Sequence, residues 1–218
     1  MIMRDNTTVI ICCAGMGTRL GIGNTKSLIN ICGKPLITHQ LEMLTNISDV
    51  RIVVGFQAES VIEIANNTRK NIMYAFNYDY DRTGTLYSMS KAMINPKEYV
   101  LIIGGDILVR PVDMEKMLNL NHEFVAYSNV TSKEPVFVHV NEMDEAISFA
   151  TDIGTREWAG IAKIKSKRFN GKYHFVYEML EKHLPLPAEK IQSVDIDTPE
   201  DYEYAIEWVE ENYNGDQL

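Results

Sequence analysis

Apolar residues in the first half of the chain fall into short continuous runs, and the segments between the runs carry apolar residues at helical spacing. Runs that are apolar at nearly every position predict strands buried on both faces of a sheet. The runs are TVIICCA (8–14), VRIVVGF (50–56), NIMYAFN (71–77) and YVLIIGGDILV (99–109). The segments that predict helices are KPLITHQLEMLTN (34–46), QAESVIEIANN (57–67), TLYSMSKAMI (85–94) and VDMEKMLNL (112–120). Strands that alternate with helices at this spacing predict a parallel α/β sheet.

After about residue 121 the pattern changes to short strands with few helices between them. The predicted strands are HEFVAYS (122–128), EPVFVHVN (134–141), AISFA (146–150) and EWAGIAKIK (157–165). They indicate a small, partly antiparallel lobe over about residues 121–170 that covers one end of the sheet. The remaining predictions are a helix in KYHFVYEMLEKHL (172–184), a strand in IQSVDID (191–197) and a closing helix in TPEDYEYAIEWVEEN (198–212). Thr198 can cap that last helix, with Asp201 three residues after the cap.

The loop CCAGMGTRLGIGNTKSL (12–28) follows the first predicted strand and holds four glycines, one arginine and one lysine. Backbone N–H groups of a glycine-rich loop can approach a ligand closely, and the neighbouring cations indicate that the ligand is a phosphate. The P-loop pattern fails because Thr25 stands where a glycine should precede Lys26. The dinucleotide fingerprint fails because Leu20 stands at its third glycine. The pattern G-x-G-T-R-L, followed by Lys26 and then GKPLI (33–37), fits throughout.

Three aspartates follow predicted strands, at the edge where open α/β sheets bind their ligands. Asp106 follows LIIGG, whereas Asp195 and Asp197 end QSVDID. Taken singly, each is as readily a turn residue, a helix cap or a surface charge. Together with a phosphate-binding loop they predict a Mg²⁺ site, because Mg²⁺ prefers one or two carboxylates combined with substrate phosphates and water.

Charge and cysteine content narrow the class of protein. The chain has 218 residues, a net charge of −9 and a pI near 5.1, which argues against a nucleic-acid surface. No apolar run approaches the ~18 residues of a membrane span, and the N-terminus lacks a cleavable signal pattern. The cysteines are Cys12, Cys13 and Cys32, without a C-x-x-C pair, so a disulfide scaffold or structural zinc site is not expected. These features fit a cytoplasmic protein that binds neither membrane nor nucleic acid.

The loop pattern and three further segments resemble one known family. The segments are KPLITHQLEML (34–44), TLYSMSKAM (85–93) and VDIDTPEDYE (194–203). They are similar to small cytidylyltransferases of the phosphocholine cytidylyltransferase type, within the sugar-1-phosphate nucleotidyltransferase and MobA-like NTP transferase family. The resemblance implies a nucleotide-diphospho-sugar transferase-like fold: a Rossmann-like, mixed but mostly parallel sheet flanked by helices. Most of the chain is covered, although the segment between G-T-R-L and Lys26 is shorter than is usual in sugar nucleotidyltransferases, and Ser27 replaces an expected proline.

The resemblance also assigns roles to individual residues. Arg19 would stabilise charge on the leaving phosphates, and Lys26 would clamp the α-phosphate. Asp106 and Asp197 match metal-binding positions, with Asp195 as a third candidate. The nucleotide-binding candidates are Ala14, Gly15, Met16, Gly17, Thr18, Gly55, Thr85 and Ser88. The acceptor-binding candidates are Glu157, Trp158 and Tyr177.

We therefore expect one nucleotidyltransferase domain over residues 1–218, with residues 121–170 forming the acceptor lobe. Its expected reaction transfers CMP from CTP to a small phosphorylated or phosphonate acceptor such as phosphocholine, with Mg²⁺ as cofactor and pyrophosphate as product. An ionised acceptor phosphate needs no general base, and none is evident among the five histidines. Two alternatives stay open: a sugar-1-phosphate nucleotidyltransferase, and a nucleotide-binding regulatory module without catalysis. A homodimer is one possible assembly.

Overall fold

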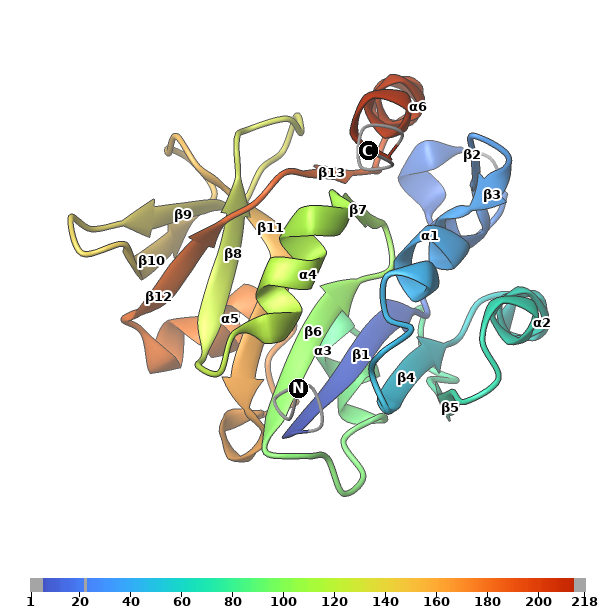
Figure 1. Cartoon of the computed structure of the whole chain (residues 1–218), viewed down its shortest axis with the longest axis horizontal. Helices are drawn as coiled ribbons and strands as arrows, with labels where there is room; N and C mark the ends of the chain where they lie inside the picture. Colours follow the sequence, from blue (N-terminus) through green and yellow to red (C-terminus); the bar gives the residue numbers. More distant parts are fainter. Residues whose placement is uncertain (1–5, 22, 214–218) are drawn as a thin grey trace.

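A nine-stranded mixed sheet with helices on both faces forms the centre of the computed structural model, which describes residues 6–21 and 23–213 (Figure 1). The strand order is β5-β4-β1-β6-β11-β8-β12-β10-β9. The strands are β1 (Thr7–Cys13), β4 (Asp49–Val54), β5 (Met73–Phe76), β6 (Tyr99–Gly104), β8 (Phe124–Ser128), β9 (Phe137–Val140), β10 (Glu145–Ala150), β11 (Glu157–Lys165) and β12 (Leu186–Lys190). Two short ribbons lie outside it, one of β2 (Asn30–Ile31) with β3 (Lys34–Pro35), the other of β7 (Ile107–Val109) with β13 (Ser193–Asp195).

The parallel half of the sheet has a doubly wound topology. From β1 in the middle the chain moves outward to β4 and β5, and then returns to β6 on the other side of β1. Strand order reverses between β1 and β6, and open α/β sheets bind their ligands in the crevice at the carboxyl ends of such strands. The glycine-rich loop leaves β1 at this point, and Asp106 follows β6 at the same point.

Helices cover both faces because successive side chains of the central strands point to opposite sides. The helices are α1 (Leu36–Glu42), α2 (Ala58–Thr68), α3 (Thr85–Ser90), α4 (Pro111–Asn119), α5 (Val176–Leu180) and α6 (Pro199–Tyr213). Val9 and Ile11 of β1 share a core with α1, α2 and α4, whereas Ile10 packs with α3 and α5. Burying an aliphatic side chain completely contributes about 1.5–3 kcal/mol, so the apolar runs stabilise both layers at once.

The second half of the chain continues the same sheet. β11 pairs antiparallel with β6 and with β8, and β12 pairs parallel with β8. The register between β11 and β8 shifts between Trp158 and Ala162, and Gly160 between them has φ 69°. This irregularity bends β11 where it passes the end of β6. The expected mixed sheet flanked by helices is confirmed, but the strands expected to form a lobe covering one end of the sheet instead extend it through β11 and β8.

Elements differ from the sequence pattern at several places. Lys34 and Pro35, predicted as the start of a helix, pair with Asn30 and Ile31, so α1 begins at Leu36. The helix predicted over 172–184 is limited to α5 and a 3-10 turn over Glu181–His183. It begins late because the Glu178 carboxylate accepts hydrogen bonds from the backbone N–H groups of His174 and Phe175, both at 2.9 Å, and so caps the helix there. Strand β12 was not predicted at all, because Pro187 inside it is a residue that normally argues against a central strand.

Helix α6 closes the fold beside the carboxyl ends of the strands (Figure 1). Its start is the expected capping box: Thr198 Oγ1 accepts from the Asp201 N–H at 3.3 Å, and the Asp201 carboxylate accepts from the Thr198 N–H at 2.8 Å. The same carboxylate accepts from the N–H of Asp197 at 3.1 Å. The cap therefore also holds the backbone of a predicted metal ligand. Among the described helices, none combines the length and apolar character that crossing a bilayer requires.

Candidate active site

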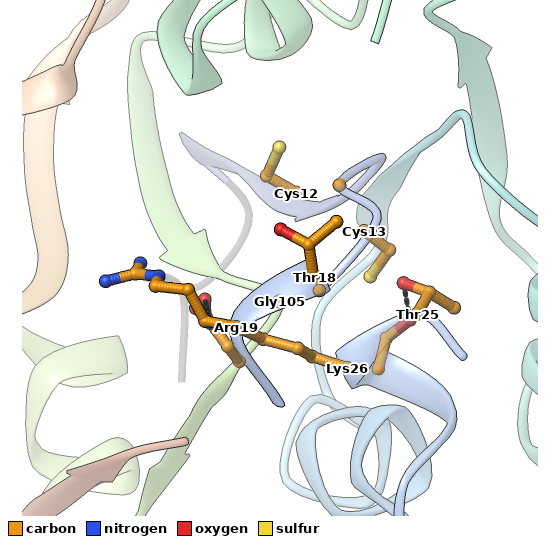
Figure 2. A pocket seen from close by; sticks show the side chains of 11 residues that line it. Cys12, Cys13, Thr18, Arg19, Thr25, Lys26 and Gly105 are labelled. Atoms are coloured by element: carbon orange, nitrogen blue, oxygen red, sulfur yellow. Dashed lines mark hydrogen bonds and ion pairs between the residues drawn. The ribbon is translucent and has the colours of Figure 1, made fainter. Parts of the chain in front are cut away.

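The glycine-rich loop encloses a cavity of about 210 Å³ at the end of β1. Figure 2 shows Thr18, Arg19 and Lys26 around this hollow, with Gly105 between Thr18 and Arg19 in the view. Gly17 has φ 63°, and a Cβ there would lie 3.0 Å from Cγ of Lys26 and 3.1 Å from the Asn24 carbonyl oxygen. The second glycine of G-x-G is thus required both by its backbone conformation and by the close passage of Lys26.

Gln57, immediately beyond β4, ties this loop to the sheet. Its Oε1 accepts from the Thr25 N–H at 2.9 Å, and its Nε2 donates to Asn24 Oδ1 at 3.1 Å. These contacts hold the residues that precede Lys26. Nothing in the sequence pattern singles out Gln57, because its partners lie more than thirty positions earlier.

The three predicted metal-binding aspartates converge. Asp106, Asp195 and Asp197 each place one carboxylate oxygen within 4.8 Å of the others. Asp106 lies in the two-residue link between β6 and β7, and Asp195 ends β13, which pairs antiparallel with β7. The Ile196 N–H also donates to the Asp106 carbonyl oxygen at 3.1 Å. The backbone therefore holds the two aspartate segments together.

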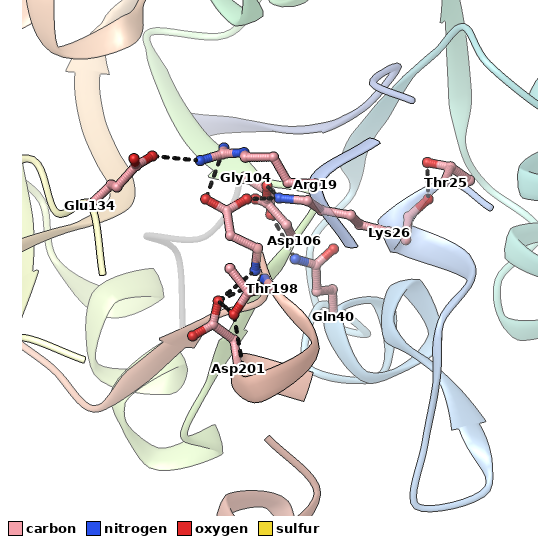
Figure 3. Close-up of polar contacts among 11 residues, drawn as sticks. Arg19, Thr25, Lys26, Gln40, Gly104, Asp106, Glu134, Thr198 and Asp201 are labelled. Atoms are coloured by element: carbon pink, nitrogen blue, oxygen red, sulfur yellow. Dashed lines mark hydrogen bonds and ion pairs between the residues drawn. The ribbon is translucent and has the colours of Figure 1, made fainter. Parts of the chain in front are cut away.

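The two predicted cations reach the same cluster (Figure 3). Lys26 Nζ lies 3.0 Å from Asp106 Oδ2 and also contacts Asp197 Oδ1. Arg19 Nη2 lies 2.8 Å from Asp197 Oδ2, and its Nη1 lies 3.5 Å from a carboxylate oxygen of Glu134. The Lys26 side chain is 12% exposed and that of Arg19 is 59% exposed. Lys26 is thus mostly buried at the cluster, whereas more than half of the Arg19 side chain is exposed.

The donor set suits a hard divalent cation. All three side chains offer carboxylate oxygens, the ligand type that Mg²⁺ prefers, and Asp195 Oδ1 is buried without a hydrogen-bond partner. Burial, reinforced by repulsion from Asp106, raises the pKa of the Asp195 carboxyl. A bound cation would reverse this effect, because it favours the ionised carboxylate. Asp106, Asp195 and Asp197 could therefore hold Mg²⁺.

The two cysteines at the end of β1 also line the loop cavity. Burial raises the pKa of the Cys12 thiol to about 11, and it raises the pKa of Cys13 further. Thiols of this kind stay protonated at neutral pH and are poor nucleophiles. They act as small packing residues, and no described cysteine is in a disulfide.

A second cavity, of about 310 Å³, opens beside the aspartates toward β11 and α5. Three of its walls are aromatic: Trp158 of β11, and Phe175 and Tyr177 around the start of α5. The centroid of the Trp158 ring lies 6.1 Å from that of Tyr177, and Phe175 stacks on Tyr177 at 5.5 Å. Two of the predicted acceptor-binding residues, Trp158 and Tyr177, therefore share one cavity that also contains all three aspartates.

Glu157 lines the same cavity, and its carboxylate also binds the loop between β8 and β9. Its carboxylate is buried and accepts from the N–H groups of Thr131 and Ser132 at 2.7 and 3.2 Å, and from the Ser132 hydroxyl. It thereby holds the loop between β8 and β9, which carries Glu134 over the cleft. The contribution of Glu134 could not be foreseen, because a charged loop residue carries no signal in a single sequence.

Three predicted nucleotide-binding residues outside the loop, Gly55, Thr85 and Ser88, lie in different surroundings. A Cβ at Gly55 would lie 2.8 Å from the Ala14 carbonyl oxygen and 2.9 Å from Cβ of Tyr80, so only glycine fits between them. Thr85 lines the second cavity, not the loop cavity. Ser88 is buried and uses its hydroxyl proton on the Gly84 carbonyl. Contact of these residues with a nucleobase stays a prediction.

The loop residues of the predicted nucleotide set differ in exposure. Exposed Gly15 and Thr18 and half-buried Gly17 line the first cavity, whereas Met16 is exposed but does not line it. Ala14 is buried, and its carbonyl oxygen accepts from the Phe56 N–H at 3.0 Å. Three of the five thus offer surface to a ligand in this cavity, while Ala14 connects the loop to the residue after Gly55.

Comparisons with known proteins place these features among nucleotidyltransferases. The family model described as the MobA-like NTP transferase domain matches residues 9–164. The bifunctional protein GlmU of Campylobacter concisus is 31% identical over 194 residues, which are 84% of this chain and 42% of that protein. The chain thus spans less than half the length of the curated relatives it matches.

Two solved structures share the fold over nearly the whole chain. One is the CTP:phosphocholine cytidylyltransferase of Streptococcus pneumoniae, with TM-score 0.76 and 20% identity, which covers 94% of this chain and 99% of that one. The other is the inositol-1-phosphate CTP transferase of T. maritima, with TM-score 0.76 and 18% identity, which covers 95% of this chain and 97% of that one.

Proposed function

Because this chain belongs to the MobA-like NTP transferase domain family, we propose that it transfers CMP from CTP to a small phosphorylated or phosphonate acceptor with a cationic end, such as phosphocholine. The observation that carries the proposal is the joint placement of Lys26, Arg19 and three aspartates between two cavities. One cavity is lined by the glycine-rich loop, the other by aromatic rings and carboxylates.

The reaction needs positioning and charge neutralisation from these residues. An acceptor phosphate or phosphonate oxygen, already ionised at neutral pH, attacks the α-phosphorus of CTP, and the bond to the departing pyrophosphate breaks. Lys26 leaves its ion pairs to bind the α-phosphate, and Arg19 turns from Asp197 and Glu134 to the leaving phosphates. No proton has to be removed from the nucleophile, which agrees with the lack of any histidine among the residues that line either cavity in the described structure.

Mg²⁺ would be held by Asp106 and Asp197, with Asp195 as a further ligand, and would neutralise phosphate charge. The segment that ends in Asp197 is held by the cap of α6, and the turn that contains Asp106 is held by the Ile196 N–H. The backbone of both aspartates is thus held before any ligand arrives, which reduces the entropy lost on binding.

The second cavity suits a cationic acceptor. Among its described lining residues, five are acidic and only Arg19 is basic. The acidic residues are Asp106, Glu134, Glu157, Asp195 and Asp197. The three aspartates would hold Mg²⁺ at the phosphate end, so an ammonium group at the other end is attracted by Glu134 and by the faces of the Trp158 and Tyr177 rings. The acceptor phosphate would then point toward Arg19 and the aspartates, where the nucleotide is expected.

The choice of CTP is supported by two proteins of the same fold that are named for CTP. The functional test is a panel of the four ribonucleoside triphosphates against phosphocholine, phosphoethanolamine, a small aminophosphonate and hexose 1-phosphates, read as pyrophosphate release with Mg²⁺. We expect turnover with CTP and one of the cationic acceptors. Turnover of hexose 1-phosphates alone would replace the proposal by a sugar-1-phosphate nucleotidyltransferase. Nucleotide binding without pyrophosphate release from any pair would indicate a regulatory module.

Trp158→Ala tests the acceptor cavity. Removal of a desolvated ring that faces a cation costs up to about 2 kcal/mol, so we expect the KM for the cationic acceptor to rise about 3–30-fold. The KM for CTP should stay within about twofold, because Trp158 lines only the second cavity. Tyr78→Ala, at a ring that is 82% exposed and lines neither cavity, is the matched control. An unchanged acceptor KM in Trp158→Ala would place the acceptor elsewhere.

A further inference from the structure

Gln40 contacts the backbone on both sides of Asp106. It lies on α1 with 1% of its surface exposed. Its Nε2 donates to the carbonyl oxygens of Gly104 and Ile107, each at 2.8 Å. Figure 3 shows its amide next to Asp106, below the ion pairs of the site in the view. One buried side chain thus spans the turn that presents a predicted metal ligand.

The turn from β6 to β7 has little other room to adjust. A Cβ at Gly105 would lie 2.1 Å from the Cys12 carbonyl oxygen, so the turn is pressed against the end of β1. On its other side, the Ile196 N–H donates to the Asp106 carbonyl oxygen. The two hydrogen bonds from Gln40 restrain the turn further, because they hold the residues immediately before and after Gly105 and Asp106.

The orientation of the Gln40 amide is determined by these contacts. Only its NH₂ group can donate to two carbonyl oxygens, since the reverse orientation would bring three oxygens together. Oε1 is consequently left buried without a partner in the described structure. An unsatisfied buried acceptor costs about 1–3 kcal/mol. The chain tolerates this cost where the two bonds of the NH₂ group hold the Asp106 turn.

We propose that Gln40 is a positioning residue for the metal site: it sets the backbone of Asp106 so that the carboxylate points toward Lys26 and Asp197. The proposal rests on the metal-binding role of Asp106 in the proposed function. Partners that orient a metal ligand typically contribute 10–100-fold to metal affinity or activity. Gln40 would act through Asp106 and would not touch the substrate.

Metal binding can be measured directly, without turnover. Mn²⁺ is titrated into the full chain, alone and with α,β-methylene-CTP, and free Mn²⁺ is counted by electron paramagnetic resonance. Gln40→Met keeps the volume and removes both donors, and we expect it to raise the Mn²⁺ Kd about 10–100-fold. Gln40→Asn keeps an amide but is one methylene shorter, so it should raise the Kd in the same direction and serves if the Met variant folds poorly.

His39→Met is the matched control. His39 is the preceding residue of α1, is buried, and hydrogen-bonds through Nε2 to the Ile31 carbonyl oxygen at 2.9 Å. This variant also loses a buried hydrogen bond from α1, but at a carbonyl remote from Asp106 in the chain. We expect it to lower Tm and leave the Mn²⁺ Kd within twofold of the parent.

The outcomes separate positioning from mere stability. A raised Mn²⁺ Kd in the Gln40 variants, with a parental Kd in His39→Met, supports the proposal. An equal loss of Tm in Gln40→Met and His39→Met with unchanged Mn²⁺ Kd values would overturn it. If the parent binds Mn²⁺ but turns over no triphosphate, the proposed function fails, while the Kd comparison still decides the role of Gln40.

Discussion

Asp197→Asn is expected to lower kcat by at least about 100-fold, with the fold intact. The variant keeps the shape of the side chain and loses the charge that would hold Mg²⁺. In the structure the Asp197 carboxylate is the common partner of Arg19 and Lys26, and its backbone N–H is held by Asp201. The substitution therefore changes the charge of the site and leaves the helix cap in place. The measurement is pyrophosphate release against Mg²⁺ concentration, with circular dichroism as the check on folding.

Asp106→Asn should behave in the same way, because its carboxylate belongs to the same cluster. Asp144→Asn is the matched control, since Asp144 is an exposed turn residue with φ 55°, a conformation that Asn also tolerates. Its kcat should equal that of the parent. Full turnover of both Asp106→Asn and Asp197→Asn at low Mg²⁺ would end the assignment of these residues to a metal.

Lys26→Ala is expected to lower kcat about 10²–10³-fold and to raise the KM for CTP much less. That split follows if Lys26 binds the α-phosphate most strongly as charge rearranges in the transition state. The location of Lys26 favours this role: its side chain is 12% exposed, and it passes directly over Gly17 of the loop. Initial rates at saturating Mg²⁺, fitted separately for kcat and KM, provide the measurement.

Lys34→Ala is the control for Lys26, because Lys34 belongs to the same sequence pattern but, among the described residues, forms its ion pair with Glu42 at the surface. Exposed pairs of this kind contribute about 0–1 kcal/mol, so neither kinetic constant should change. In an alternative explanation, Lys26 serves only to reduce the electrostatic repulsion among the aspartates. If so, Lys26→Ala would lower Tm but would keep the parental kcat at saturating Mg²⁺ and CTP, and the proposed phosphate-binding role would be wrong.

Much of the fold could be predicted because its strands are apolar throughout and its first half alternates strand and helix. The strands β1, β4, β5 and β6 and the strands β8 to β11 lie where the pattern predicts them, whereas β2 and β3 have no counterpart in it. Two local effects were not visible. Glu178 caps α5 through its side chain, and Pro187 lies in a strand that pairs on both sides. Both depend on contacts with other segments, and not on the local pattern.

The charged residues of the candidate site could be predicted from the sequence, but the residues that hold them in place could not. Asp106, Asp195 and Asp197 could be expected to meet Lys26 because each follows a strand or the loop at one edge of the sheet. The supporting residues Gln40 and Gln57 could not be expected. Their partners are backbone or amide atoms 32 to 67 positions away, and a glutamine on a helix face or after a strand has no distinguishing pattern.

The sequence by itself determined what depends on neighbours along the chain. Apolar runs specify strands, Gly17 permits a positive φ in the loop, and Thr198 with Asp201 specifies the start of the last helix. The tertiary structure alone decided what depends on the distance between segments. It brought Trp158 and Tyr177 to one cavity. It also brought the Glu157 carboxylate within hydrogen-bonding distance of the loop between β8 and β9, and the Gln40 amide within hydrogen-bonding distance of the turn that contains Asp106. The physical reason is that backbone conformation follows local sterics and hydrogen bonding, whereas these contacts exist only once the sheet has brought its strand ends together.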